Sequence, residues 1–471
     1  MIQDDVFPSR RTFLARSAGG VGLLALSHLL GARASAAVVR RPAEPPLGTA
    51  PKARSIICLF QHGGPSHLDL TDPKPALAMW HGQPYPAGDL EIHADKERGN
   101  VLASPFRFYR HGRAGIELSE LLPHTGRVAD ELTLVRSMTT ESIDHEGALR
   151  CIHTGRTRAG FPTWGSWIVY ALGTECENLP AYVVLSDPHG LPIDGTRNWS
   201  SGWLPAVHQG TSFRTGDKTA VANLAVPATV PPVARVDQLR FLERLNRRHE
   251  LLHPGNHELA ARIQNFELAA RMQTSVPDVL DADQEPESIR RLYGLDNPAC
   301  RDYGTRCLLA RRLVEKGVRF VQVFLPGQPW DTHSNHAAGL AQVCQTTDQP
   351  SAALVADLKQ RGLLESTIVL WAGEFGRLPI AQGEDGRDHN RHGFSLWLAG
   401  GGFRAGYVHG ATDEFGYRAV RDPVCVHDLH ATLLQAMGLD HRHIAYPHEG
   451  RPTTLTDADI TRARVVRELL A

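Results

Sequence analysis

Short apolar runs that recur along the chain constrain its fold more than any other feature of the sequence. Six stand out, at residues 55–60, 132–136, 182–185, 319–325, 367–371 and 394–398. Runs of this length that stop at glycine or polar residues are typical of strands buried on both faces of a parallel sheet. Helical patterns separate several of them, at residues 307–316, 337–364 and 427–437. The alternation predicts an α/β fold, with a parallel or mixed sheet and helices on both faces.

One long helical segment interrupts this alternation. Residues 236–273 and 287–293 are rich in Leu, Arg and Glu at helical spacing. We therefore expect a helical insert at about residues 236–295, packed beside the sheet. It would belong to a single α/β domain over residues 54–471, which follows a Pro-rich linker at residues 37–53.

The N-terminus has the pattern of an export signal. Arg10 and Arg11 precede a weakly apolar stretch at residues 18–30, and an Ala-Ser-Ala site ends at Ala36. This pattern predicts a twin-arginine signal peptide over residues 1–36, and hence a periplasmic or extracellular protein. The alternative is a membrane anchor, but the apolar stretch is shorter than the ~20 residues that span a bilayer. No later segment is long and apolar enough to cross one, so we expect no membrane span after cleavage.

Charge and cysteine content exclude several classes of protein. The 471 residues carry 50 Lys and Arg against 51 Asp and Glu, for a formal net charge of −1. This balance provides no basic face for nucleic acid, so we expect no nucleic-acid partner. The seven cysteines contain no C-x-x-C pair, which excludes a zinc ribbon, a thioredoxin-type site and a dense disulfide scaffold. Histidine, with 24 residues, is the unusual component.

Polar residues of metal-binding type follow the apolar runs where the strands are expected to end. In an open α/β sheet, ligands bind at the carboxyl ends of the strands. Five segments distant in sequence therefore bring His, Asp and Glu to one predicted edge, which indicates a divalent metal site. Mixed imidazole and carboxylate ligands suit Zn²⁺, Mn²⁺ or Fe²⁺, and carboxylates alone suit Mg²⁺ or Ca²⁺. The residues are His62, Ser66, Asp69 and Asp72 after the first run, Asp144, His145 and Glu146 after the second, Asp331, His333 and His336 after the fourth, Glu374 and Arg377 after the fifth, and Asp388, His389 and His392 before the sixth.

These segments resemble the alkaline phosphatase and sulfatase superfamily. The closest resemblance is to a twin-arginine-exported, sulfatase-like family of unknown function within it (domain of unknown function fifteen-oh-one). The resemblance covers about residues 54–451 and implies an alkaline-phosphatase-like three-layer α/β/α sandwich and a metal-dependent hydrolase. The matching motifs are HGGPSHLDLTDPKP at 62–75, HTGR at 153–156, WDTH at 330–333, GEFGR at 373–377, GRDH at 386–389, LAGGG at 398–402, GATDE at 410–414 and HDLHATLL at 427–434.

Carried over residue by residue, the resemblance implies a metal pocket but departs from the superfamily at its nucleophile. In the superfamily a Ser, Thr or modified Cys opens a helix that ends in Thr-Gly-Arg. Counting back from residues 154–156 places Asp144 and His145 there, without a hydroxyl or thiol. Gln61 and His62 also replace the usual metal-binding Asp after the first strand. The implied metal ligands are Asp69, Asp331, His333, Glu374, Asp388, His389 and His392.

Two routes remain open for an active enzyme. A metal ion could activate water for direct attack by lowering its pKa. Alternatively, a hydroxyl such as that of Ser66, Thr139, Thr140 or Ser142 could act from a shifted position. Arg156 or Arg377 would either stabilise negative charge in the transition state or form a structural ion pair. The candidate catalytic residues are His145, Ser66, Arg156 and Arg377.

Three functions are consistent with these residues. The first is an exported metal-dependent hydrolase of sulfate or phosphate esters, acting on a small molecule or a glycan. The second is a non-catalytic, metal-stabilised relative that binds an anionic glycan or partner in the ancestral cleft. The third is a structural exported protein with a fortuitous histidine cluster.

Overall fold

The computed structural model describes residues 50–93, 98–215 and 231–471. The predicted signal peptide and most of the linker lie outside the described residues. In the described part of the chain, no helix has both the length and the apolar character needed to cross a membrane.

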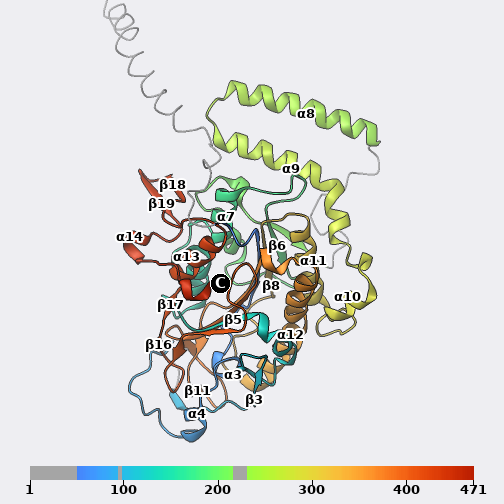
Figure 1. Ribbon diagram of the computed structural model, residues 1–471. Coiled ribbons are helices and arrows are strands. Elements are labelled where there is room, and N and C mark those ends of the chain that lie inside the picture. The colour runs from blue at the N-terminus through green and yellow to red at the C-terminus, as the bar shows by residue number, and fades with distance from the viewer. Residues whose placement is uncertain (1–49, 94–97, 216–230) are drawn as a thin grey trace, which may run out of the picture.

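A mixed sheet of nine strands forms the centre of the described chain (Figure 1). Its order is β14-β5-β13-β9-β1-β8-β6-β7, with β17 beside β5. Neighbouring strands are parallel except at β13, which runs antiparallel to β5 and β9. Each of the six apolar runs forms a strand of this sheet, which confirms the α/β prediction. The strands are β1 (Ser55–Phe60), β5 (Leu132–Thr139), β6 (Tyr182–Ser186), β7 (Thr211–Arg214), β8 (Phe320–Phe324), β9 (Thr367–Ala372), β13 (Phe394–Ala399), β14 (Tyr407–His409) and β17 (Val424–Cys425).

Helices cover both faces of the sheet and make three layers. Side chains of a strand alternate between the faces, so Ile57 and Leu59 of β1 join one core while Ile56, Cys58 and Phe60 join the other. The first core contains residues of α11 and α12, and the second contains residues of α6, α7 and α13. The helices are α3 (His67–Leu70), α4 (Pro75–Met79), α5 (Pro123–Arg127), α6 (His145–Thr154), α7 (Trp164–Leu172), α8 (Pro232–Leu252), α9 (His257–Leu280), α10 (Glu287–Leu292), α11 (Arg301–Glu315), α12 (His336–Gln360), α13 (Val426–Ala436) and α14 (Ala458–Thr461).

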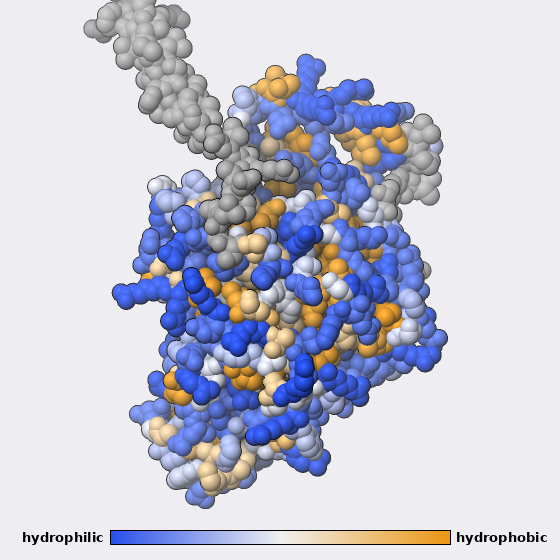
Figure 2. Space-filling model, in the orientation of Figure 1, coloured by the Kyte–Doolittle hydropathy of each residue, from blue (hydrophilic) through white to orange (hydrophobic). Residues whose placement is uncertain are grey.

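The segment expected as a helical insert contains α8, α9 and α10. The first two form a hairpin, because the chain turns at residues 253–256 and Asn256 caps the new helix by accepting a hydrogen bond from the Leu259 N–H. The C-terminal part of α9 packs against the α/β domain, where Met272 and Val276 join the core that contains residues of α11. By contrast, α8 lies farther out and exposes apolar side chains such as Phe241 (Figures 1 and 2).

Short strands surround the central sheet and carry the loops at its edge. One of them, the antiparallel pair β10–β12, places Gly376 opposite Asn390 and Arg377 opposite His389. The short strands are β2 (Arg98–Val101), β3 (Phe108–His111), β4 (Ile116–Ser119), β10 (Gly376–Arg377), β11 (Ile380–Gln382), β12 (His389–Asn390), β15 (Ala411–Thr412), β16 (Ala419–Arg421), β18 (Ala445–His448) and β19 (Arg451–Thr454).

Candidate metal centre

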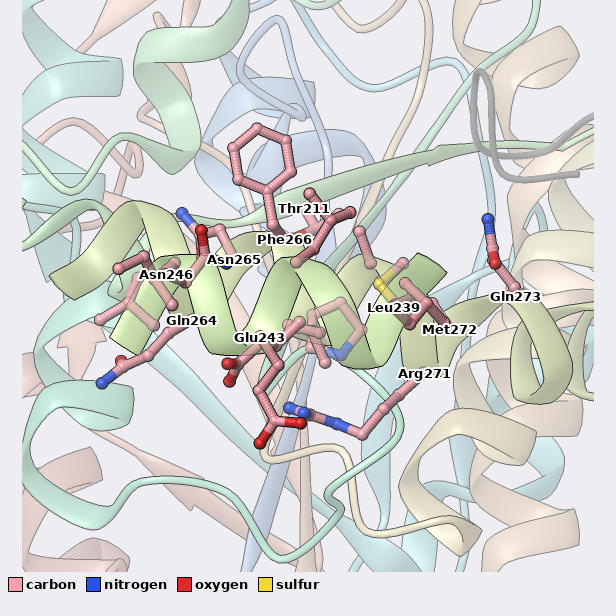
Figure 3. A pocket seen from close by; sticks show the side chains of 18 of the residues that line it. Thr211, Leu239, Glu243, Asn246, Gln264, Asn265, Phe266, Arg271, Met272 and Gln273 are labelled. Atoms are coloured by element: carbon pink, nitrogen blue, oxygen red, sulfur yellow. The ribbon is translucent and has the colours of Figure 1, made fainter. Parts of the chain in front are cut away.

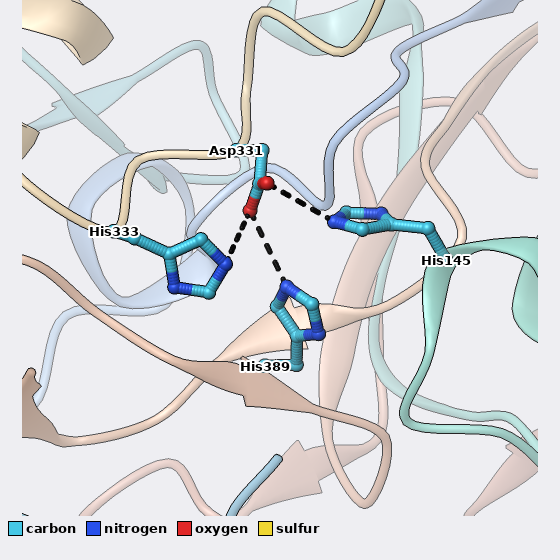
Figure 4. Close-up of side chains that lie close together, drawn as sticks. All are labelled: His145, Asp331, His333 and His389. Atoms are coloured by element: carbon cyan, nitrogen blue, oxygen red, sulfur yellow. Dashed lines mark hydrogen bonds and ion pairs between the residues drawn. The ribbon is translucent and has the colours of Figure 1, made fainter. Parts of the chain in front are cut away.

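Four of the predicted residues converge at the carboxyl edge of the sheet. His145 is the first residue of α6, Asp331 and His333 lie in the loop between β8 and α12, and His389 lies in β12. One ligand atom from each of the four lies within 4.8 Å of the others. In Figure 4 the three imidazoles surround the Asp331 carboxylate. Segments up to about 240 residues apart therefore meet at one point, as expected for strand ends on a shared edge.

Asp331 is the centre of this cluster. Its Oδ1 lies 2.9 Å from His333 Nε2 and 3.3 Å from His389 Nε2, and its Oδ2 lies 3.3 Å from His145 Nε2. Burial raises the pKa of Asp331, but its contacts with the three imidazoles and the charge of Arg377 outweigh it and hold the pKa well below its ordinary range. The carboxylate is therefore charged at every ordinary pH, as a metal ligand must be.

Glu374 supports the cluster from behind. This fully buried carboxylate accepts hydrogen bonds from His145 Nδ1 at 2.7 Å and from the Gly63 N–H at 2.9 Å. It thereby directs the other ring nitrogen of His145 toward Asp331, which is the usual role of a carboxylate behind a metal-ligating histidine. Burial lowers the pKa of His145, but hydrogen bonds to Asp331 and Glu374 prevail and raise it to about 9.

Gly63 is required at this position for a steric reason. It follows β1 with φ of 107°, in the region that favours glycine. A Cβ here would lie 2.5 Å from the backbone nitrogen of Asp331. The missing side chain lets the first rim loop pack directly against the loop that carries Asp331.

Arg377 holds the same loops together through hydrogen bonds to their backbone carbonyls. Its guanidinium is fully buried and donates to the carbonyls of Gly63, Gly64 at 2.9 Å and Arg387 at 3.0 Å. It also forms an ion pair with Asp331 Oδ1 at 2.7 Å. With its donors engaged in this way, Arg377 positions a ligand of the cluster rather than facing a substrate.

The two other histidines of the cluster are also oriented by fixed partners. His389 donates from Nδ1 to the Ile143 carbonyl at 2.8 Å, which leaves Nε2 toward Asp331. Burial lowers the pKa of His389 to about 3, so this imidazole is neutral and able to bind a metal. The Nδ1 of His333 contacts the Gln382 side-chain oxygen.

Asp69 and Ser66 lie in a different network. Asp69 is fully buried and accepts from Arg387 Nε at 2.7 Å and from His336 Nε2 at 2.8 Å. The Ser66 hydroxyl donates to the same carboxylate at 2.5 Å. The oxygens of Asp69 are thus occupied by cationic and polar donors, and the Ser66 hydroxyl is engaged with Asp69.

Of the remaining predicted residues, His392 and Arg156 pair with residues outside the four. His392 Nε2 pairs with Glu91 at 2.6 Å. Arg156 follows the C-terminal end of α6, opposite His145, and pairs with Asp457 at 2.6 Å. Asp388 lies beside the cluster in a second group with His93 and His389.

The cluster fits a divalent metal ion. Three imidazoles and one carboxylate are a donor set that suits Zn²⁺, Mn²⁺ or Fe²⁺. Two carboxylate oxygens beside it, Glu374 Oε2 and Asp388 Oδ1, are buried and have no hydrogen-bond partner among the described residues. Buried carboxylate oxygens without donors are costly unless a cation offsets them.

Two residues of this region were missed from the sequence. His93 and Gln382 follow no apolar run that forms a strand of the central sheet, so the search at strand ends did not reach them. Among described residues, a groove also lies at α8 and α9, lined by Thr211, Leu239 and Phe266 among others (Figure 3). That groove shares no residue with the cluster.

Three solved structures show what the chain is similar to. The PsFucS1 sulfatase from Pseudoalteromonas sp. has 12% identity and a TM-score of 0.34, covering 83% of this chain and 68% of its own. The phosphonate monoester hydrolase SpPMH from Silicibacter pomeroyi has 11% identity and a TM-score of 0.34, and the match covers 88% of this chain and 78% of the hydrolase chain. The lipoteichoic acid synthase LtaP from Listeria monocytogenes has 9% identity and a TM-score of 0.35, and the match covers 88% of this chain and 78% of the synthase chain. TM-scores this low carry no argument about the activity of this chain.

Sequence comparison identifies the family directly. No curated protein matches the chain. A family model described as "Protein of unknown function (DUF1501)" matches residues 53–470, which include every element described above. This agrees with the family that the motifs resemble, so the chain belongs to the DUF1501 family.

Proposed function

We propose that this protein is an exported, metal-dependent hydrolase of sulfate or phosphate esters. The observation that carries the proposal is the cluster of His145, Asp331, His333 and His389 at the carboxyl edge of the sheet. Export is supported by the twin-arginine pattern at Arg10 and Arg11.

The residues around the cluster support a hydrolytic site rather than a fortuitous one. Glu374, Arg377 and the Ile143 carbonyl each orient one member of it. Such partners fix the ring orientation of metal-ligating histidines. These residues would hold a divalent ion, which would provide Lewis acidity for polarising an ester oxygen and for lowering the pKa of water toward ~7.

Among the candidate nucleophiles, we favour water for this reaction. The Ser66 hydroxyl is committed to Asp69 at 2.5 Å, and the Ser142 hydroxyl donates to Asp144 at 2.5 Å. The helix that should begin with a nucleophile begins with His145, whose ring is held between two carboxylates. In this proposal, His145 contributes a ligand where relatives in the superfamily place a nucleophile.

Metal analysis and an ester screen test the proposal together. The protein from residue 37 onward would be purified without a His tag, loaded separately with Zn²⁺, Mn²⁺ and Ca²⁺, and assayed on aryl sulfates, aryl phosphates and an aryl phosphonate ester. We expect turnover with at least one ion and its loss in His333→Ala and Asp331→Asn.

The exposed His443 provides a matched control. Its side chain pairs with Asp440 at 2.9 Å and is 64% exposed. His443→Ala should therefore keep metal and activity. Metal binding without turnover on any ester would favour the non-catalytic relative, and a folded protein that binds no ion would refute both.

A further inference from the structure

The hairpin of α8 and α9 carries most of the apolar side chains that the described residues expose. Of thirteen large apolar side chains exposed in this part of the chain, seven lie within residues 236–266, and six of those seven belong to α8. Single exposed apolar residues are ordinary on a protein surface, whereas a contiguous patch marks a surface that binds a protein or a membrane. The concentration on one helix therefore indicates a binding surface.

Three of these side chains form a stripe along one side of α8. Phe241, Leu245 and Leu252 are spaced by four and seven positions, which places them on one side of a helix. They are 53%, 45% and 67% exposed. The groove beside α9 is lined by other residues of α8, such as Leu239 and Glu243 (Figure 3). This outer stripe therefore faces away from the rest of the chain, on the helix that lies farthest from the sheet in Figure 1.

A row of arginines runs beside the outer stripe. Arg240, Arg244 and Arg248 follow one another at intervals of four residues, so they also share one side of the helix. All three are exposed. The Arg244 guanidinium lies 5.9 Å from the centre of the Phe241 ring, which shows that this arginine row adjoins the stripe. The outer surface of α8 is therefore both apolar and cationic.

Few acidic residues offset this charge. Of the three carboxylates of α8, those of Glu243 and Glu250 belong to residues that line the groove. Glu243 also forms an ion pair with Arg247, one turn away. Among the described side chains of α8, Asp237 is the acidic one that lies outside the groove lining. Three arginines against one aspartate leave the outer surface positive.

This chemistry fits the surface of a bilayer that contains anionic phospholipid. Helices that lie in the plane of a membrane have Phe and Leu on one side and Lys or Arg beside them. The apolar side chains enter the boundary between headgroups and acyl chains, and the planar guanidinium binds lipid phosphate through paired hydrogen bonds. A second copy of the chain fits less well. Pairing two such surfaces would bring two arginine rows together, and facing like charges oppose binding.

We propose that α8 docks the protein on an anionic membrane surface, with the outer stripe at the acyl boundary and the arginine row on lipid phosphates. The helix lies along the surface, since no helix of the described residues is long and apolar enough to cross a membrane. The inference uses no residue of the metal cluster, so it stands or falls apart from the proposed function.

Co-sedimentation of the full mature chain with vesicles tests this inference. Large unilamellar vesicles of phosphatidylcholine would be compared with vesicles of equal parts phosphatidylcholine and phosphatidylglycerol. We expect the native chain to bind the mixed vesicles in preference to the neutral ones. Binding should weaken as the salt concentration rises, because salt screens the attraction between exposed charges.

Two variants test the two parts of the surface. Arg244→Gln should lower the partition coefficient onto the mixed vesicles about 5-fold, the contribution expected of one basic side chain near an anionic surface. Phe241→Ala combined with Leu245→Ala should lower it at least about 10-fold, because less apolar surface leaves water. Alanine favours helix and both positions are exposed, so the far-ultraviolet circular dichroism spectrum should not change.

Matched controls lie outside α8. Arg158→Gln removes an exposed arginine and Ile460→Ala shortens an exposed isoleucine, so both variants should bind the mixed vesicles as the native chain does. Absence of binding to the mixed vesicles would overturn the inference. So would equal binding to both kinds of vesicle, or binding that survives the Phe241→Ala and Leu245→Ala pair. A lipid-free dimer in sedimentation velocity that this pair dissociates would assign the stripe to a second copy and overturn the membrane.

Discussion

The substitution Asp69→Asn discriminates between a metal ligand and a structural ion pair. The sequence indicated a ligand, whereas the structure places Asp69 against Arg387 Nε at 2.7 Å, with both side chains fully buried. Asparagine keeps the size of the side chain but removes its charge. The Arg387 guanidinium would then be buried without a counter-ion, a change that typically costs about 3–5 kcal/mol of stability.

Burial raises the pKa of Asp69, but the charge of Arg387 and the hydrogen bond from His336 outweigh it, so the pKa is far below its ordinary value. The carboxylate is therefore ionised in the native state, and the full cost applies at neutral pH. Urea unfolding of the metal-free protein, followed by far-ultraviolet circular dichroism, measures this loss. Metal per chain would be measured on the folded variant.

We expect a large loss of stability with unchanged metal content. A double-mutant cycle with Arg387→Met should show that removing both charges costs less than the sum of the single changes. Loss of a metal ion at native stability, or a destabilisation below about 1 kcal/mol, would show that Asp69 does not have the role described here.

Three further predictions address other parts of the site and core. Glu374→Gln should weaken Zn²⁺ binding about 10- to 100-fold in a chelator competition, because the carboxylate orients a ligand; unchanged affinity would contradict this role. Burial lowers the pKa of His153 and of His430 from 6.5 to about 3, so the unfolded chain binds their protons first as pH falls. The free energy of unfolding should be retained above pH 6.5 and should fall below it, by roughly 2 kcal/mol per histidine at pH 5. His153→Gln should make the free energy of unfolding depend less steeply on pH. An unchanged slope would contradict the lowered pKa of His153. Arg156→Ala removes a partly exposed ion pair with Asp457 and a hydrogen bond to the Gly155 carbonyl, both away from the cluster. Metal content should therefore be retained, and stability should fall by about 1 kcal/mol.

Six of the nine strands of the central sheet were predictable from the sequence because their signal is local. A continuous apolar run specifies a strand buried on both faces wherever the strand lies in the sheet. All six runs formed such strands. The edge where these side chains gather followed as well, since the carboxyl ends of parallel strands share one edge. His145, Asp331, His333 and His389 were found in this way.

Helix limits were less well predicted. The pattern at residues 236–273 suggested one helical stretch, but the structure contains α8 and α9, and the second continues to Leu280. The break lies at residues 253–256, which include a proline and a glycine. Similarly, the pattern predicted a helix over residues 337–364, but α12 ends earlier, at Gln360.

Only the tertiary structure decided which charged side chains meet. Asp69, Glu374 and Asp388 are all acidic residues of the same predicted edge, yet they differ in role. One pairs with Arg387, one holds His145, and one has a carboxylate oxygen without a donor. Residue type fixes the chemistry that a side chain can perform. Partners brought together from distant loops determine which part of that chemistry is used, and sequence spacing does not encode those contacts.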